Sequence, residues 1–283
     1  MSDILSMKPA KPLLEVRNLV TEFPVRNGVF RAVNDLSFSI DPGKTLCVVG
    51  ESGSGKSVTA RSILQIIDSP GRIASGSIIL NRADGTSLDL AKLDPRSRAI
   101  RSVRGADIAM IFQEPMSSLS PVHTVGDQIT EVLRLHLKMS KAEARAEAIE
   151  LLRQVEIPNP EKALDRYAFQ YSGGMRQRAM IAMALACKPQ LLIADEPTTA
   201  LDVTTQAEIL DLISRLQKAH GMAVLFITHD MGVVAQIADD VLVMHRGVAK
   251  EYGTVDEIFH SPQDPYTRML IGSCLLYTSD AAD

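Results

Sequence analysis

The sequence contains no tryptophan and only 7 phenylalanines and 5 tyrosines among its 283 residues. Proteins that bind single-stranded nucleic acid stack the bases on aromatic side chains, so this scarcity gives no support for such a surface. The net charge of −4 likewise provides no basic footprint for DNA or RNA. We therefore expect no nucleic-acid partner.

Cysteine is equally scarce, and no two of Cys47, Cys187 and Cys274 form a CxxC pair. The sequence therefore predicts no zinc or iron–sulfur site, and a reducing cytosol is the expected compartment. The first residues, MSDILSMKPAKPLLEV, lack an apolar core behind a basic start, so we expect no signal peptide. The longest apolar run has nine residues, Ala179 to Cys187, which is too short to span a membrane.

The remaining composition, with 46% hydrophobic and 23% charged residues, is that of an ordinary globular protein and excludes disorder. Short runs that are apolar on both faces alternate with helical patterns, which predicts parallel strands covered by helices. The expected strands are Thr45–Val49, Asp107–Phe112, Leu191–Ala194 and Ala223–Thr228. The expected helices are Ser57–Ile67, Met175–Cys187 and Gln206–Ala219. A hairpin is expected from Val241–His245 and Val248–Tyr252.

Two regions depart from this alternation. Residues 13–40 and 75–81 have the pattern of short, half-exposed strands in an antiparallel sheet. Residues 125–155 have a helical pattern, in which Ser140 and Glu143 form a capping box. The sequence thus predicts an α/β fold with an antiparallel β part and a helical part.

A glycine-rich loop follows the strand that ends at Val49. Residues 50–57, GESGSGKS, fit the pattern GxxxxGK[ST] between a strand and a helix, a context that disfavours an ordinary glycine turn. Backbone N–H groups of such a loop bind phosphates, while Lys56 reaches the β- and γ-phosphates and Ser57 binds Mg²⁺. The predicted nucleotide contacts are Gly50, Glu51, Ser52, Gly53, Ser54, Gly55, Lys56, Ser57 and Val58.

The strand Leu191–Ala194 leads into two carboxylates, Asp195 and Glu196. Asp195 would lie beside the phosphate loop at the carboxyl edge of the sheet and hold the metal through water. Glu196, one residue further on, can polarise the attacking water. On its own, an apolar strand followed by Asp-Glu could equally be a surface turn. In a chain that also has a phosphate loop, the pattern predicts nucleotide hydrolysis.

Two glycines also precede the predicted helix that begins near Met175. Their exposed backbone N–H groups could bind a phosphate, although a glycine helix start without a ligand is the alternative. Because the chain already has a phosphate loop, a nucleotide held by another subunit is the economical explanation. The residues expected to act in trans are Ser172, Gly173, Gly174, Met175, Arg176 and Gln177.

These motifs, in this order, resemble the ATPase subunit of an ATP-binding cassette (ABC) transporter over roughly Leu13 to Tyr266. SGGMRQR stands where that family has its signature motif. Gln113 matches the glutamine loop, Asp202 the aspartate loop at the dimer interface, and His229 the switch histidine. The resemblance implies ATP and Mg²⁺ as cofactors. It implies the catalytic residues Glu196, His229 and Gln113 and the magnesium ligands Ser57, Gln113 and Asp195.

The resemblance also implies a domain organisation within residues 13–270. A P-loop NTPase core of the RecA-like type, with a mainly parallel sheet, would carry an N-terminal antiparallel β subdomain and an inserted α-helical signature subdomain. The first would comprise residues 13–45 and about 72–90, and the second about 115–172. Residues 271–283 form a tail that does not resemble the family, so we expect the native C-terminal extension to be missing or replaced. We therefore do not extend the iron–sulfur cluster of some members to this chain.

A narrower resemblance is to the ATPases of dipeptide and oligopeptide importers, a group that includes nickel and glutathione importers. It is carried by GESGSGKS, FQEPMSSLSP, YSGGMRQRAMIAMAL, ADEPTTALDV and DPYTRML, with departures at Glu114, Ser120 and Ala168–Phe169. It implies uptake of di- or oligopeptides, with nickel or glutathione as alternatives.

The same resemblance implies partners and a location. A second, related ATPase subunit would complete a head-to-tail dimer, and two transmembrane permease subunits would dock around Met116–Thr124. An extracytoplasmic solute-binding protein would deliver the solute. The chain would then lie at the cytoplasmic face of the inner membrane.

Some assignments remain open at this point. Phe23 is the candidate for stacking on adenine, Phe30 is the alternative, and core packing is the competing role of either. The histidines other than His229 show no metal-ligand spacing. An ABC ATPase acting on DNA or ribosomes lacks support, because neither a coiled-coil insertion nor a second cassette is present. A generic P-loop kinase or GTPase does not explain SGGMRQR or His229.

Overall fold

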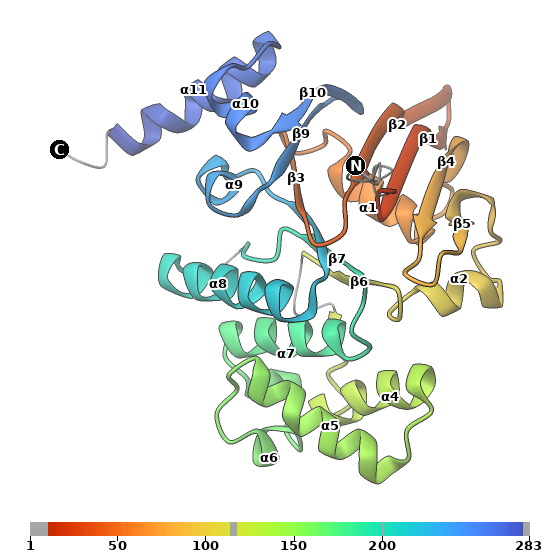
Figure 1. Ribbon diagram of the computed structural model, residues 1–283, viewed down its shortest axis with the longest axis vertical. Coiled ribbons are helices and arrows are strands. Elements are labelled where there is room, and N and C mark those ends of the chain that lie inside the picture. The colour runs from red at the N-terminus through yellow and green to blue at the C-terminus, as the bar shows by residue number, and fades with distance from the viewer. Residues whose placement is uncertain (1–10, 114–117, 200, 280–283) are drawn as a thin grey trace, which may run out of the picture.

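The computed structural model describes residues 11–113, 118–199 and 201–279, with side chains up to residue 273 (Figure 1). One sheet is antiparallel, with the strand order β2-β1-β4-β5, and the other is mainly parallel, with the order β10-β9-β3-β8-β7-β6. The first consists of β1 (Leu14–Val25), β2 (Gly28–Ile40), β4 (Arg72–Asn81) and β5 (Ser87–Asp89). The second consists of β3 (Thr45–Val49), β6 (Ile108–Ile111), β7 (Leu191–Asp195), β8 (Ala223–Ile227), β9 (Asp240–His245) and β10 (Val248–Thr254).

Helices follow most strands of the parallel sheet, as expected of this architecture. The α-helices in the described residues are α1 (Lys56–Ile63), α2 (Arg98–Val103), α4 (Val125–Leu137), α5 (Lys141–Gln154), α6 (Pro160–Ala163), α7 (Gly173–Leu185), α8 (Val203–His220), α9 (Met231–Ile237), α10 (Val255–His260) and α11 (Pro265–Ser279), and the 3₁₀ helices are η1 (Leu90–Lys92) and η2 (Ala168–Gln170). The predicted α/β class is confirmed.

The parallel sheet is buried on both faces. Leu46 and Val48 of β3 belong to the hydrophobic cluster that includes α1 and the antiparallel sheet. Cys47 and Val49 belong to the cluster formed with α4, α5, α7 and α8 on the other face. The inner strands β3, β7 and β8 therefore have no solvent-facing side, and this is why they read as continuous apolar runs, whereas the edge strand β10 is largely exposed.

The helical layer formed by α4, α5 and α7 lies beneath the core in Figure 1. The capping box at α5 is confirmed, because the Ser140 hydroxyl accepts from the Glu143 N–H and the Glu143 carboxylate from the Ser140 N–H. The continuous helical pattern over 125–155 is nevertheless divided in two. Lys138 adopts a left-handed φ of 58° and ends α4, and Ser140 then starts α5 in a new direction.

The prediction of short strands in 13–40 was wrong, because β1 and β2 are long strands of 12 and 13 residues. Asn18 (φ 48°) and Asp35 (φ 57°) are left-handed and face each other, with the Asn18 side-chain amide donating to the Asp35 carboxylate at 2.8 Å. The pairing of β1 with β2 shifts its register near these residues, as at a β-bulge, but the pairing continues beyond them. They interrupt the alternation of apolar residues, and the sequence pattern therefore suggests breaks that the backbone does not have.

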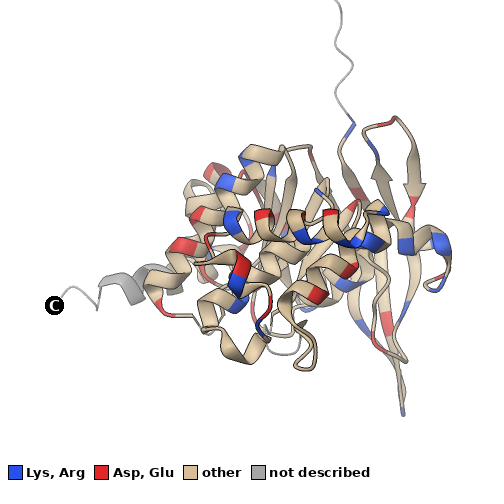
Figure 2. Cartoon of the chain, turned by 90° about the horizontal axis from the view of Figure 1, so that it is seen from below, with Lys and Arg blue, Asp and Glu red and all other residues tan. Residues whose placement is uncertain are grey.

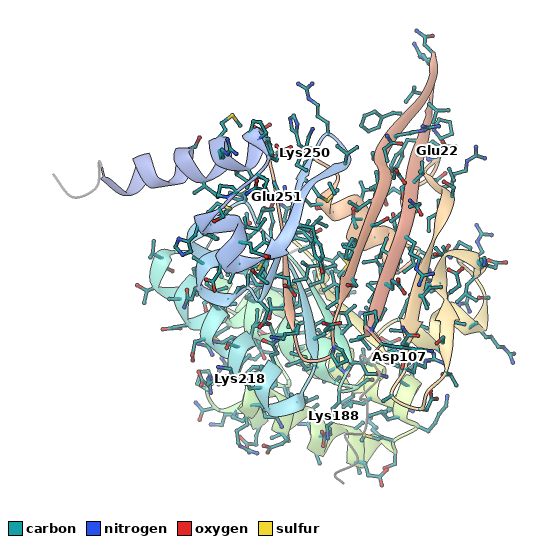
Figure 3. All side chains as sticks on the ribbon, turned by 45° about the horizontal axis from the view of Figure 1, so that its top comes forward. Glu22, Asp107, Lys188, Lys218, Lys250 and Glu251 are labelled. Carbon is teal, nitrogen blue, oxygen red and sulfur yellow. The ribbon has the colours of Figure 1, made fainter. Side chains whose placement is uncertain are left out.

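Arg82, after β4, joins the antiparallel sheet to the core through Asp107, before β6, with 2.6 Å between guanidinium and carboxylate. Asp107 is labelled in Figure 3. At the other end, α11 runs through the predicted boundary at residue 270 without interruption. None of the helices in the described ranges combines the length and apolar character needed to cross a membrane.

The helical layer offers a test of packing. Leu152 of α5 is fully buried, whereas Leu135 of α4 is 62% exposed. Leu152→Ala should lower the free energy of unfolding by about 2–5 kcal/mol, because it leaves a cavity. The same truncation at Leu135 should change it by less than about 0.5 kcal/mol. Urea denaturation of both variants checks this, and equal effects would contradict the described burial.

Candidate nucleotide-binding and catalytic site

The phosphate loop connects β3 to α1 and is pressed between two other segments. Gly50 has a φ of +146°, and a Cβ there would lie 2.1 Å from the Met244 carbonyl oxygen of β9. Gly55 has a φ of +100°, and a Cβ there would lie 2.4 Å from the Ala32 carbonyl oxygen of β2. Only glycine fits either position, since both the backbone angle and the available space exclude a side chain.

The Lys56 side chain folds back over this loop. Its ammonium donates to the carbonyl oxygens of Gly50 (2.7 Å) and Glu51 (3.0 Å), and the residue is only 5% exposed. Burial lowers the pKa of Lys56, while the charges of Glu196 and Asp195 oppose that shift. The buried Ser54 hydroxyl in the same loop has no hydrogen-bond partner among the described residues. A buried ammonium held only by carbonyls and an unpaired hydroxyl fit an anionic ligand such as a phosphate.

Ser57 and Asp195 form the second part of the site. The Ser57 hydroxyl, in the first turn of α1, donates to Asp195 Oδ1 at the end of β7 at 2.9 Å. Burial raises the pKa of Asp195, its bond from Ser57 opposes this, and the nearby Glu196 adds to it. A buried carboxylate beside a hydroxyl is a donor set that suits Mg²⁺. No group of three or more His, Cys, Asp or Glu among the described residues could hold a metal ion alone. A magnesium ion at this pair would therefore need further ligands, such as the phosphates of a nucleotide.

The three predicted catalytic residues lie together, because Gln113 and His229 both approach Glu196. Gln113, which follows β6, donates its amide to Glu196 Oε2 at 3.0 Å, and His229 Nδ1 lies 3.5 Å from Glu196 Oε1. Thr199, which was not predicted, donates its hydroxyl to Glu196 Oε2 at 3.0 Å. Glu196 has a φ of +47°, which is unusual for a side chain of this kind and common at functional sites.

The Glu196 cluster arises from the sheet topology. β6, β7 and β8 are neighbouring parallel strands, so the residues that follow them reach the same edge of the sheet. The edge holds Gln113 after β6, Asp195 and Glu196 at the end of β7, and His229 after β8. Gln113 thus contacts the predicted base Glu196, although it was also expected to hold the metal.

The predicted signature residues lie at the start of α7. Ser172 is the N-cap, and its hydroxyl accepts from the Met175 N–H at 3.3 Å. A Cβ on Gly173 would lie 3.9 Å from Leu201, and one on Gly174 would lie 3.0 Å from the Thr205 methyl group. The two glycines therefore sit beneath the segment that begins α8. Arg176 donates to the Tyr171 carbonyl, and Gln177 is buried.

The remaining predicted residues occupy neighbouring positions. Asp202 caps α8, with its carboxylate accepting from the Thr205 N–H at 2.9 Å. Phe23 lies opposite Phe30 in the β1–β2 ladder and is half-buried, while Phe30 is 57% exposed. A Cβ on Gly71 would lie 2.4 Å from the Phe23 ring, so that ring packs closely on the backbone at Gly71.

Two contacts of Tyr266, one of them with the phosphate loop, were not predicted. The Tyr266 hydroxyl accepts from the Glu51 N–H at 3.2 Å, and the Tyr266 ring stacks on His245. DPYTRML, which contains Tyr266, is one of the motifs that carry the resemblance to importer ATPases, but nothing in the sequence indicated what this segment contacts.

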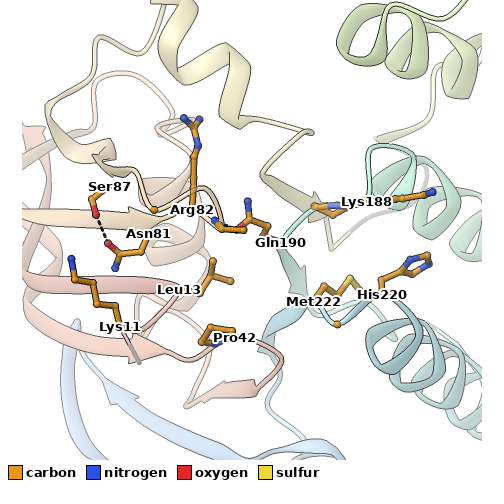
Figure 4. A pocket seen from close by; sticks show the side chains of 14 residues that line it. Lys11, Leu13, Pro42, Asn81, Arg82, Ser87, Lys188, Gln190, His220 and Met222 are labelled. Atoms are coloured by element: carbon orange, nitrogen blue, oxygen red, sulfur yellow. Dashed lines mark hydrogen bonds between the residues drawn. The ribbon is translucent and has the colours of Figure 1, made fainter. Parts of the chain in front are cut away.

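A crevice of about 430 Å³ lies at the opposite edge of the sheet. Its walls include Pro42, Gln190 and His220, which precede β3, β7 and β8, so it faces away from the phosphate loop. Figure 4 shows Lys11 and Lys188 on opposite sides of it. Its cationic groups do not converge on one point, and it is not the nucleotide site.

Comparisons with known proteins identify the family of this chain. The family described as ABC transporter matches residues 33–199. The glutathione import ATP-binding protein GsiA of Pectobacterium atrosepticum is 55% identical over 268 residues, which cover 94% of this chain and 43% of that protein. The chain thus spans less than half the length of the curated relatives that it matches.

Solved structures are similar as well. The dimeric post-hydrolysis state of the ATP-binding cassette MJ0796, bound to ADP and Pi, has a TM-score of 0.74 at 25% identity, covering 86% of this chain and 98% of its own. The cbiO1 structure from Clostridium perfringens, part of the ABC transporter complex cbiONQ, has a TM-score of 0.70 at 26% identity, covering 89% and 92%. The chain therefore belongs to the ABC transporter family and forms one of its ATPase cassettes.

Proposed function

We propose that this chain binds ATP with Mg²⁺ and hydrolyses it in a head-to-tail ATPase dimer that drives import of a small solute through partner permeases. The observation that carries the proposal is the convergence of Gln113 and His229 on Glu196, next to the Ser57–Asp195 pair. A phosphate site, a metal-binding pair and a base with two polar neighbours are the groups that phosphoryl transfer to water requires.

Each residue has a defined role in this proposal. Lys56 exchanges its two carbonyl contacts for the β- and γ-phosphates, since charged acceptors bind an ammonium more strongly. Ser57 and Asp195 would hold Mg²⁺, which would neutralise phosphate charge when bound. Glu196 accepts a proton from the attacking water, and Gln113 and His229 orient that water and the γ-phosphate. Phe23 is the proposed adenine contact.

The start of α7 acts on a nucleotide of the partner subunit. Its backbone N–H groups and Ser172 would meet the γ-phosphate held by the partner's loop, because a helix N-terminus favours an anion. Asp202 and the signature residues lie on one surface, since Gly174 packs against Thr205 of the helix that Asp202 caps. A dimer with two such surfaces would enclose two nucleotides.

Glutathione is the solute best supported within the expected importer group. The similar proteins from Pectobacterium atrosepticum and Shigella flexneri are named glutathione import ATP-binding proteins, at 55% and 56% identity. Glutathione is itself a short peptide, so this narrows the expectation of di- or oligopeptide uptake and disfavours nickel. An extracytoplasmic solute-binding protein would supply the solute.

An apolar groove of about 270 Å³ supports the site of permease docking. Phe112, Met110, Val132 and Met183 line it from β6, α4 and α7, and Phe112 is 38% exposed. The groove runs along β6, which precedes the predicted docking segment 116–124 in the chain; residues 116 and 117 of that segment lie outside the described residues. Docking there would hold the chain at the cytoplasmic face of the membrane.

Surface charge does not favour an ABC ATPase that acts on nucleic acid. Figure 2 shows Lys and Arg interspersed with Asp and Glu over the helices of one face, without a continuous basic patch. Such a mixture gives little attraction for a phosphate backbone.

Glu196→Gln should retain ATP binding but reduce hydrolysis by roughly 10²-fold or more, because the amide cannot accept a proton from water. Turnover with saturating ATP and the partner subunits present, together with ATP affinity, checks this. Glu131→Gln, an exposed carboxylate of α4, is the matched control and should change neither quantity. Hydrolysis by Glu196→Gln at the parent rate would remove Glu196 from the mechanism.

Gly174→Asp should leave ATP affinity of the isolated chain unchanged but abolish ATP-dependent association with the partner ATPase. A carboxylate at the start of α7 would repel the facing γ-phosphate. Because an added Cβ already approaches Thr205 at 3.0 Å, Gly174→Ala controls for the space alone and should retain association. Light scattering and calorimetry on one preparation decide the matter. A loss of affinity in the isolated Asp variant would place the segment in the cis site instead.

Ala184→Glu adds a charge to the apolar groove, where a docked permease would desolvate it. We expect loss of co-purification with the permeases and retained ATP binding. Ala146→Glu makes the same change at an exposed position of α5 and should co-purify as the parent does. Normal assembly of Ala184→Glu would place the docking surface elsewhere.

A further inference from the structure

The geometry points to Tyr266 as a positioning residue for nucleotide binding, which holds the phosphate loop from α11 and acts through Lys56. The inference rests on the proposed ATP binding. It starts from the peptide unit between Gly50 and Glu51, the first of the loop. The Tyr266 hydroxyl accepts from the N–H of this peptide at 3.2 Å, and Lys56 donates to its carbonyl oxygen at 2.7 Å.

One peptide plane is thus held from both sides. Rotation of that plane would break both contacts together, because its N–H and C=O point in opposite directions. Because Glu51 is exposed, water could otherwise accept from its N–H, and the Tyr266 hydroxyl is the acceptor that keeps this N–H in one direction. Holding the N–H aims the carbonyl of Gly50 at the ammonium, and this places Lys56 in the loop before a phosphate arrives.

The hydroxyl itself is rigidly placed. The Tyr266 ring stacks on His245 with 4.2 Å between ring centroids and 20° between planes. His245 is the last residue of β9, and its neighbour Met244 provides the carbonyl oxygen against which Gly50 is packed. The end of β9 therefore supports the peptide on one side and the tyrosine ring on the other. Burial raises the pKa of Tyr266, and its bond from Glu51 opposes this shift, so the phenol stays neutral at physiological pH.

The segment that carries Tyr266 is also fixed at its base. Glu251 of β10, labelled in Figure 3, accepts from the N–H groups of Gln263 (2.7 Å) and Asp264 (3.0 Å). Asp264 in turn accepts from the Tyr266 N–H at 2.7 Å. Two carboxylates thus order the turn before α11, and Tyr266 enters the loop from a preorganised support.

Tyr266→Phe tests the inference, because it removes the hydroxyl and keeps the ring on His245. We expect about 2- to 10-fold weaker ATP binding, the range for losing one hydrogen bond. Tyr252→Phe is the matched control, since it removes a hydroxyl that donates to the Ser39 carbonyl at 3.2 Å, away from the loop. The control should bind ATP as the parent does. Equal affinities of parent and Tyr266→Phe would overturn the inference.

A double-mutant cycle with Lys56→Ala separates positioning from general stabilisation. If Tyr266 acts through Lys56, Tyr266→Phe should have no further effect on ATP affinity once Lys56 is alanine. An equal loss in both backgrounds would show that Tyr266 acts independently of Lys56, and the inference would be wrong.

A nucleotide-free measurement keeps the inference apart from the proposed function. The rate at which an amine-reactive reagent labels Lys56, followed by mass spectrometry, should rise several-fold in Tyr266→Phe and stay unchanged in Tyr252→Phe. Lys250, exposed on β10, serves as the internal reference. An unchanged Lys56 rate would overturn the inference even if ATP binds. Failure of the parent to bind ATP would overturn the proposed function and leave the labelling result to decide the role of Tyr266.

Discussion

The close approach of two backbones to the phosphate loop is the constraint on which the rest of the structure depends. A loop that directs several N–H groups at one anion must turn sharply, and its outer side must rest on something rigid. Here it rests on the carbonyl oxygens of Met244 and Ala32, and Gly50 and Gly55 allow that contact. The Gly247 N–H also donates to the Ser54 carbonyl at 3.0 Å. The core sheet and the antiparallel sheet must therefore meet at the loop.

The strand order of the core sheet brings the predicted catalytic residues together. Parallel neighbours β6, β7 and β8 deliver Gln113, Glu196 and His229 to one edge, although these residues are far apart in the sequence. A single sharp turn at Glu196, with its left-handed φ, aims the carboxylate back toward that edge. Neither the crevice at the opposite edge of the sheet nor the apolar groove along β6 is lined by Gln113, Glu196 or His229, so both lie apart from this cluster.

The features of the fold and site that could be predicted are those whose sequence signal lies within a few neighbouring residues. The strand around Val48 and the phosphate loop could be predicted, because burial on both faces and glycine spacing leave marks within a few residues. The contacts of Thr199 with Glu196 and of Tyr266 with Glu51 could not, since each depends on how distant segments pack. The bulge at Asn18 hid a long strand, because one left-handed residue shifts the alternation on which the prediction relies.

Contacts within the chain also connect the Glu196 cluster to the start of α7. After Glu196, the Thr199 N–H donates to the Glu196 carbonyl at 3.2 Å, and the Leu201 N–H donates to the Thr198 carbonyl at 3.2 Å. A Cβ on Gly173 would lie 3.9 Å from Leu201, and one on Gly174 would lie 3.0 Å from Thr205, so both side chains lie close to the start of α7. In the proposed dimer, a displacement of Glu196 during the reaction would reach the start of α7 through these contacts, where the partner's nucleotide would be held. In a dimer with two such sets of contacts, hydrolysis at one nucleotide would alter the surface that holds the other, and this gives the two sites a physical route to act together.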